Sequence, residues 1–388
     1  LTNICPLFYV ETLADLSKSV RAGRTPEQEV GIIADRFPEM SGYPNAHHAD
    51  LCISNLLGNP VPMTGQIPGA GGRQVKTDRG IGSVFEPSAE AKAFSRWQQH
   101  DFLEIEREFA REWRSALAAL DLEAVTTRLQ ALGIDVSSCS TFLEAKKVAK
   151  RIAMSRDEPH VTMQLALLYL DVSPNIQTTV MERWKSANSA PLVEYAPYAA
   201  YGLMVELFIH ICLAANLISG KRPSSRLDLS YLYYLPFCMM FVSSDNLHRS
   251  CAPLFMRCDQ EFVWGPQLKS NLAEINDFFL TLPDSTKQQG ILSFASEPPA
   301  IGDCMVVQLW DRLIPLWRRK PAATGDSTPA RLVSVEEIKA MAEAPAMLPQ
   351  EMENGSLESR AVVIKRRIKR QKGSWYQVAK GPETEVDH

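Results

Sequence analysis

Three observations in the sequence predict an α/β fold, with a parallel sheet flanked by helices. The run Phe237–Val242 is apolar on both faces, which is typical of a strand in a parallel sheet that helices cover. An amphipathic helical pattern, Arg226–Leu235, precedes this run and ends at Pro236, which cannot continue a helix. A second strand-like run, Ile4–Val10, leads into a helical pattern that begins at Glu11. We therefore expect the two runs to be strands of one parallel sheet.

Acidic residues stand where such a sheet would present functional groups, beyond the carboxyl ends of its strands. Glu11 follows the first strand directly, and Asp245 follows the second after two serines. We expect Asp228 to start the helix before the second strand, from which it can reach the same edge. Asp15 lies four positions after Glu11 and shares its helical face. For Asp15, an acidic face turned to solvent is the competing explanation.

Two stretches of the chain resemble a PIN-like nuclease domain. Residues 226–248 (RLDLSYLYYLPFCMMFVSSDNLH) are similar to its C-terminal half, where an aspartate at a helix start precedes an apolar strand, a serine- or threonine-rich step and a second aspartate. Residues 4–16 (ICPLFYVETLADL) are similar to the strand and helix that carry the family's glutamate, here Glu11. The resemblance also implies a first strand that bears an aspartate, which we expect ahead of Leu1.

The resemblance implies a metal-dependent endoribonuclease that hydrolyses RNA phosphodiester bonds with Mg²⁺ or Mn²⁺. Glu11, Asp228 and Asp245 would be both catalytic and metal-binding, since hard divalent ions take carboxylate oxygens. The ion would generate a water nucleophile and neutralise charge on the transferring phosphoryl group. Water or phosphate would be oriented by three further residues, Asp15, Ser243 and Ser244. The resemblance leaves open whether cleavage serves a toxin, a defence system or RNA processing, and it allows for an antitoxin or another protein partner.

The sequence pattern divides the chain into four segments. Residues 1–90 are expected to form the first part of the PIN-like domain, residues 91–200 a large helical insertion, and residues 201–320 the second part. Residues 321–388 are rich in Pro, Ala, Ser, Thr and charge, which predicts a flexible linker and tail. Aromatic and apolar residues recur at helical spacing in the insertion, which predicts a packed core: Phe94, Trp97, Phe102, Ile105, Phe109 and Trp113.

Two segments invite a binding function of their own. The glycine-rich stretch 69–80 lacks the spacing of a phosphate-binding loop, so a β-hairpin or an ordered surface loop is expected there. Residues 362–372 (VVIKRRIKRQK) carry six basic residues, and Trp375 and Tyr376 follow. Such a run can bind RNA phosphates, with a solvated basic tail as the alternative. The residues expected to contact RNA are Lys365, Arg366, Arg367, Lys369 and Arg370.

Composition narrows the class of protein. The formal net charge of −4 argues against a uniformly basic nucleic-acid-binding protein. Eight cysteines without a CxxC pair favour free thiols in a reducing compartment, so a cytoplasmic location is expected. The apolar run 201–219 has the length of a membrane span, but Glu206 and His210 interrupt it, and an acidic residue at the bilayer centre is costly. A buried helix is therefore expected rather than a membrane segment.

Two other functions compete with the nuclease. One is a catalytically inactive protein that keeps the fold and binds nucleic acid or acts as an antitoxin. The other is a helical interaction scaffold, in which the acids are helix caps and strand ends, an ordinary use of aspartate. Convergence of the Glu11, Asp228 and Asp245 carboxylates at one sheet edge would favour the nuclease, and dispersal of the three would favour the scaffold.

Overall fold

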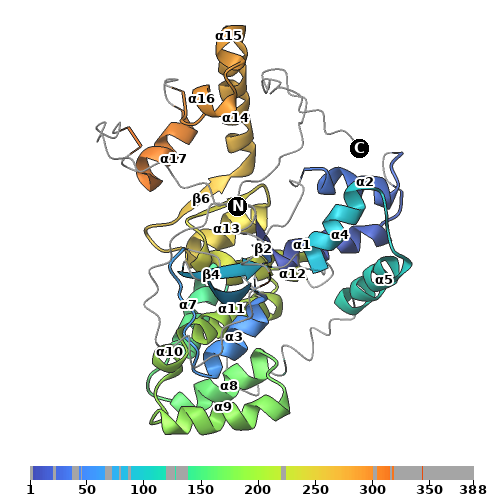
Figure 1. Cartoon of the computed structure of the whole chain (residues 1–388). Coiled ribbons are helices and arrows are strands. Elements are labelled where there is room, and N and C mark those ends of the chain that lie inside the picture. The colour runs from blue at the N-terminus through green and yellow to red at the C-terminus, as the bar shows by residue number, and fades with distance from the viewer. Residues whose placement is uncertain are drawn as a thin grey trace. The chain divides into compact units, whose positions relative to one another are not determined.

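The computed structural model describes residues 3–20, 23–36, 43–44, 46–65, 72–77, 80–85, 89–118, 139–219, 224–299, 304–314 and 317–318, together with residues 127 and 343 (Figure 1). The chain divides into two compact units. The first unit comprises Leu1–Gly72, Phe85–Phe241 and Asp245–Phe262, and the second comprises Arg73–Val84, Val242–Ser244 and Val263–His388. Parts of the three predicted segments 1–90, 91–200 and 201–320 all contribute to the first unit.

Helices make up most of the described chain. Those of the first unit are α1 (Pro6–Ala14), η1 (Asp15–Ser17), α2 (Pro26–Ala34), α3 (His48–Leu56), α4 (Ala89–Gln98), α5 (Glu104–Ala118), α7 (Phe142–Ala153), α8 (Pro159–Tyr169), α9 (Pro174–Ser186), α10 (Leu192–Tyr195), α11 (Pro197–Ala214), α12 (Ser224–Ser230), η2 (Tyr231–Phe237) and α13 (Asn246–Phe255), where η denotes a 3₁₀ helix. Those of the second unit are α14 (Gly265–Leu280), α15 (Asp284–Lys287), α16 (Ile291–Phe294) and α17 (Met305–Leu313).

The described strands are short and form three two-stranded sheets. Strands β1 (Asn3–Ile4) and β2 (Tyr43–Pro44) pair in parallel, with Asn3 opposite Tyr43 and Ile4 opposite Pro44. Strand β3 (Gly72–Thr77) pairs with β4 (Gly80–Phe85), so the predicted hairpin is confirmed. Strand β5 (Met240–Ser243) pairs with β6 (Glu261–Trp264). The protein is thus mainly helical with a small parallel sheet, which agrees with the α/β class in its coarse form.

The predicted pairing of Ile4–Val10 with Phe237–Val242 in one parallel sheet is wrong. Pro6 occupies the first turn of α1, where its fixed φ favours a helix, so the first strand ends at Ile4. The second strand is displaced as well, because Phe237 ends the 3₁₀ helix η2 and β5 begins only at Met240. Apolar runs of this length fit a buried helix or a strand equally well by periodicity alone.

Helix α11 lies at the centre of the main hydrophobic core. It is apolar on all sides, and α3, α7, α8 and α10 pack around it. The buried side chain of Asn55 on α3 accepts hydrogen bonds from the Tyr198 and Ala199 amides at 2.8 and 3.1 Å, which ties α3 to the first turn of α11. Among the described helices, α11 alone is long and apolar enough to cross a membrane, and 83% of that stretch is buried inside the protein.

A second core joins the N-terminal helices to the aromatic helices α4 and α5. Phe94 and Trp97 are buried against residues of α1, η1 and α2, so the predicted packing of the aromatic stripe is correct there. It is wrong for Ile105 and Phe109, which are 65% and 42% exposed. The predicted aromatic stripe spans two helices, α4 and α5, which a short loop joins. Because of this loop, Ile105 and Phe109 of α5 do not continue the buried face that Phe94 and Trp97 form on α4.

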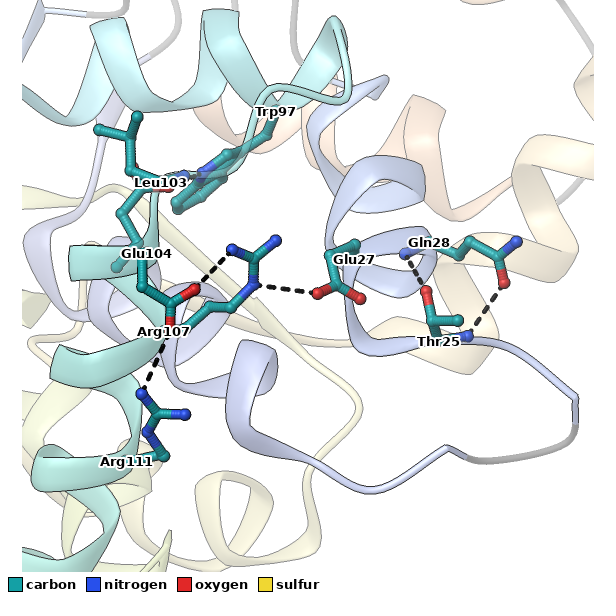
Figure 2. A network of polar contacts seen from close by, with 9 residues as sticks. Thr25, Glu27, Gln28, Trp97, Leu103, Glu104, Arg107 and Arg111 are labelled. Carbon is teal, nitrogen blue, oxygen red and sulfur yellow. Dashed lines mark hydrogen bonds and ion pairs between the residues drawn. The ribbon is translucent and has the colours of Figure 1, made fainter.

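A polar network holds these helices together at the edge of the second core. The buried carboxylate of Glu106 accepts the Trp97 indole N–H and the Leu103 amide, both at 3.0 Å, and pairs with Arg96. Figure 2 shows the outer part of the network, where Arg107 bridges Glu27 on α2 and Glu104 on α5, both at 3.1 Å. The same view shows the helix cap formed by Thr25 and Gln28 at the start of α2.

Glu106→Ala should lower the free energy of unfolding by roughly 2–4 kcal/mol, because the Trp97 indole and the Leu103 amide lose a buried acceptor and Arg96 loses its counter-charge. Urea denaturation followed by far-UV circular dichroism measures this loss. Glu104→Ala is the matched control on the exposed face of α5, and it should change stability by less than about 1 kcal/mol. Equal losses in the two variants would contradict the role assigned to Glu106.

Candidate functional site

The three acids predicted to act together come from three helices of the first unit, and the structure brings them close enough for their charges to interact. Glu11 lies in α1, Asp228 in α12, and Asp245 at the N-cap of α13. Burial, followed by the negative charges of Asp245 and Glu11, raises the pKa of Asp228 to about 7. Glu11 and Asp228 are half-buried and Asp245 is exposed, so the acidic group is open to solvent on one side.

The local positions of these acids differ from those predicted. Glu11 lies well inside α1 because Pro6 starts that helix five residues earlier. Asp228 does not start its helix, since α12 begins at Ser224. Asp245 follows β5 as predicted, and its Oδ1 accepts the amides of Leu247 and His248 at 2.6 and 3.1 Å. Glu11 and Asp228 therefore lie within helices and Asp245 lies at a helix N-cap, and the three acids are not together at the edge of a sheet.

Two residues that the sequence analysis missed complete this group. The Tyr231 hydroxyl donates a hydrogen bond to Oε2 of Glu11 at 2.7 Å, across 220 positions of sequence. The ring of His248 lies 2.6 Å, through Nε2, from the backbone carbonyl oxygen of Asp228. Spacing could have found both, because Tyr231 follows Asp228 by three residues and His248 follows the capping Asp245 by three, which places each on the same side as its acid.

The roles predicted for Asp15, Ser243 and Ser244 stay predictions, and each of these residues has contacts of its own. Asp15 forms ion pairs with Lys18 and with Arg114 of α5, so it belongs to the second core and not to the acidic group. Ser243 and Ser244 belong to the second unit, where they lie against Gly265, the first residue of α14. A Cβ at Gly265 would come within 2.3 Å of the Ser244 hydroxyl, so glycine permits this close approach.

Two further predictions bear on binding. The basic residues Lys365, Arg366, Arg367, Lys369 and Arg370 lie outside the residues that the structure describes, so their contact with RNA stays a prediction. Within the described ranges, no group of three or more His, Cys, Asp or Glu side chains is arranged closely enough to surround a metal ion. The three acids interact through their charges without forming one compact set of ligands.

Glu206 and His210 of α11 form a separate buried network with Arg226 of α12. Oε2 of Glu206 lies 3.5 Å from Nε2 of His210 and 3.5 Å from a guanidinium nitrogen of Arg226. Burial alone would raise the pKa of Glu206, but the His210 hydrogen bond and the Arg226 charge outweigh it and lower that pKa. The expectation that Glu206 finds polar partners is confirmed.

The surroundings of this network are only partly satisfied. The Tyr233 hydroxyl and the Nδ1 atoms of His48 and His210 have no partner at hydrogen-bond geometry. Tyr233 is 1% exposed, and the His48 ring stacks on it with centroids 4.1 Å apart. Burial lowers the pKa of His48 to about 4, so its imidazole is neutral at physiological pH.

Asp228→Asn should make the protein more stable above pH 7 and leave it unchanged near pH 4. The folded-state pKa of Asp228 is raised from 3.8 to about 7, so the folded protein holds this proton more tightly than the unfolded chain. Stability from the protonated form is complete below pH 3.8 and is lost as pH rises through about 7. Urea denaturation of both proteins at pH 4, 6 and 8 measures the difference, and equal stability at all three values would refute the shift.

Glu206→Gln should lower the free energy of unfolding by roughly 1–3 kcal/mol, because His210 and Arg226 lose a buried charged acceptor. Thermal denaturation at pH 7 measures the loss, and Glu194→Gln at an exposed ion pair with Arg156 is the control. Full stability of the Glu206 variant together with altered function would instead place Glu206 in the functional site.

The chemistry of the site follows from these residues alone. No protein-family profile, no curated protein and no solved structure matches this chain. Burial and the charges of Asp245 and Glu11 raise the pKa of Asp228 to about 7, so this carboxyl group can exchange a proton near neutral pH.

Proposed function

We propose that the protein is a metal-dependent endoribonuclease of the PIN-like class, with Glu11, Asp228 and Asp245 as its catalytic and metal-binding residues. The observation that supports this proposal is the raised pKa of Asp228, caused by burial and by the charges of Asp245 and Glu11. Asp228 and Asp245 lie in the stretch that resembles the C-terminal half of a PIN-like domain, and Glu11 lies in the N-terminal stretch. The interaction of their charges supports the nuclease, although Glu11 and Asp228 lie in helices and not at one sheet edge.

A cluster of like charges points to a missing positive partner. Mutual repulsion destabilises the ionised state of Asp228, as its pKa shows, and a bound cation would relieve that repulsion. Structural ion-pair networks also shift pKa values, but there the partner has the opposite charge and lowers the pKa of a carboxyl group. Here burial and both neighbouring charges act in the same direction, which favours a binding role over a stabilising one.

The donor set suits Mg²⁺ or Mn²⁺. Mg²⁺ commonly takes one or two protein carboxylates and completes its octahedral shell with water and substrate phosphate, so one or two of Glu11, Asp228 and Asp245 would suffice to hold it. When bound, such an ion supplies a water nucleophile and neutralises charge on the phosphoryl group.

The chain's own residues set the pH at which the site binds. Asp228 must lose its proton to act as a ligand, so cation affinity should rise as pH increases through about 7 and level off above it. Tyr231 donates to one oxygen of Glu11 and orients the carboxylate. Asp245 is exposed, so RNA phosphates in solvent can approach the acidic group on this side.

A helical interaction scaffold is the second candidate function. It is favoured by the capping of α13, where Asp245 satisfies two backbone amides and so has a structural role that needs no ion. The exposed apolar residues Ile105 and Phe109 of α5 also suit a contact with another protein.

Asp245→Asn separates these two functions, because asparagine caps a helix as well as aspartate does and removes only the charge. We expect the wild type, produced with any residues that its gene encodes ahead of Leu1, to cleave single-stranded RNA with Mn²⁺ and to stop when EDTA is added. The variant should cleave at least about 10-fold more slowly, with a melting temperature no lower than that of the wild type, because the substitution also removes a charge that repels Asp228. A fluorescent RNA assay measures the rates.

Asp15→Asn is the matched control, because Asp15 is an acid of the same N-terminal stretch that pairs with Lys18 and Arg114 outside the group. Its cleavage rate should equal that of the wild type. Cleavage that is independent of metal, or an equal rate in Asp245→Asn, would remove the proposed site. Absence of any cleavage in the wild type would favour the scaffold.

A further inference from the structure

We infer that His248 is the positioning residue of the acidic group and that it holds Asp228 and Asp245 beside each other through two hydrogen bonds made by one residue. The inference concerns the same site as the proposed nuclease and rests on that function for its metal-binding consequence. The positioning role itself rests on the contacts that His248 makes with Asp228 and Asp245.

His248 touches both aspartates at once. Its backbone amide donates to Oδ1 of Asp245 at 3.1 Å, and its ring Nε2 meets the backbone carbonyl oxygen of Asp228 at 2.6 Å. The residue is 6% exposed, so both contacts are shielded from water on the histidine side. Helices α12 and α13, which carry the two acids, are thereby joined at the point where the acids lie.

The acceptor fixes the tautomer of the ring. A carbonyl oxygen can only accept, so Nε2 of His248 carries the proton that forms the 2.6 Å bond. Two aromatic rings fix the plane of the imidazole from its sides. Tyr231 and Phe241 lie nearly perpendicular to it, with centroids 5.5 and 5.2 Å away.

The third acid is tied to the same frame. Tyr231 contacts the His248 ring with its own ring and holds Glu11 with its hydroxyl. Tyr231 is the first residue of η2, which follows α12 directly. Tyr231, which holds Glu11, and Asp228 therefore belong to adjacent turns. Contacts of His248 therefore extend to all three acids.

Repulsion makes such a frame necessary. Two carboxylates of like charge repel each other, so nothing in the interaction of Asp228 with Asp245 favours their proximity. A buried hydrogen bond contributes stability that resists this separation. Removing the ring donor should let α12 move relative to α13 and spread the acids, which a general loss of stability elsewhere would not do.

The experiment compares His248→Leu, which removes the ring donor, with His248→Gln, whose side-chain amide can place an N–H near the position of Nε2. Asn55→Ala is the matched control, because Asn55 also joins two helices through buried hydrogen bonds but lies away from the acids. Isothermal titration with Mn²⁺ and the melting temperature without metal are measured for each protein.

His248→Leu should weaken Mn²⁺ binding by about 10- to 100-fold, as loss of a supporting hydrogen bond does at other metal sites. His248→Gln should restore the affinity to within about threefold of the wild type. Asn55→Ala should lose melting temperature and keep the wild-type affinity. Equal affinity in the Leu variant, failure of the Gln variant to restore it, or an equal loss in Asn55→Ala would overturn the inference.

Nuclear magnetic resonance keeps this test separate from that of the proposed function. Without added metal, the ¹⁵N shifts of His248 in the wild type should report a proton on Nε2, and the carboxyl ¹³C shifts of Asp228 and Asp245 should move in His248→Leu but not in His248→Gln. An Nε2 without a proton, or carboxyl shifts that do not respond, would refute the positioning role. If these signals behave as expected and the wild type binds no Mn²⁺, the proposed nuclease function is refuted and the positioning role of His248 stands.

Discussion

The burial of α11 is the constraint on which the main core depends. A helix that is apolar on every side has to be covered on every side, and α3, α7, α8 and α10 do this around Pro197–Ala214. Its first turn still needs acceptors for backbone amides, which Asn55 supplies from α3. The covering helices and the Asn55 cap together leave α11 few alternative positions. The position of α11 therefore fixes the positions of the helices that pack on it.

The acidic group is connected to that reference by charge. Glu206 and His210 are the polar residues of α11 that face Arg226 of α12, and an ionised carboxylate inside the core strongly favours keeping that partner. Arg226 precedes Asp228 by two residues, so the anchor of α12 and the central acid of the group lie on neighbouring positions of one short helix. A buried ion pair far from the solvent-facing acids thus helps decide where one of them stands.

The group itself combines repulsion with attachment. Burial and the charges of Asp245 and Glu11 raise the pKa of Asp228 at a cost in stability, whereas Tyr231 bonds to Glu11 and His248 bonds to the Asp228 carbonyl. Replacing one of these acids would increase the stability of the fold. The presence of all three therefore favours a role in binding a ligand. The same balance explains why the acids interact without closing into a compact set of ligands in the metal-free molecule.

The sequence by itself determined the features that depend on near neighbours. The cap of α2, the burial of α11 and the hairpin of β3 and β4 follow from patterns a few residues long, and the three candidate acids come from the family resemblance. Tertiary structure alone decided that Asp15 would pair with Arg114 and that Tyr231 would hold Glu11. Both contacts depend on which distant surfaces pack together, and contacts between residues so far apart in the chain leave no periodic trace in the sequence.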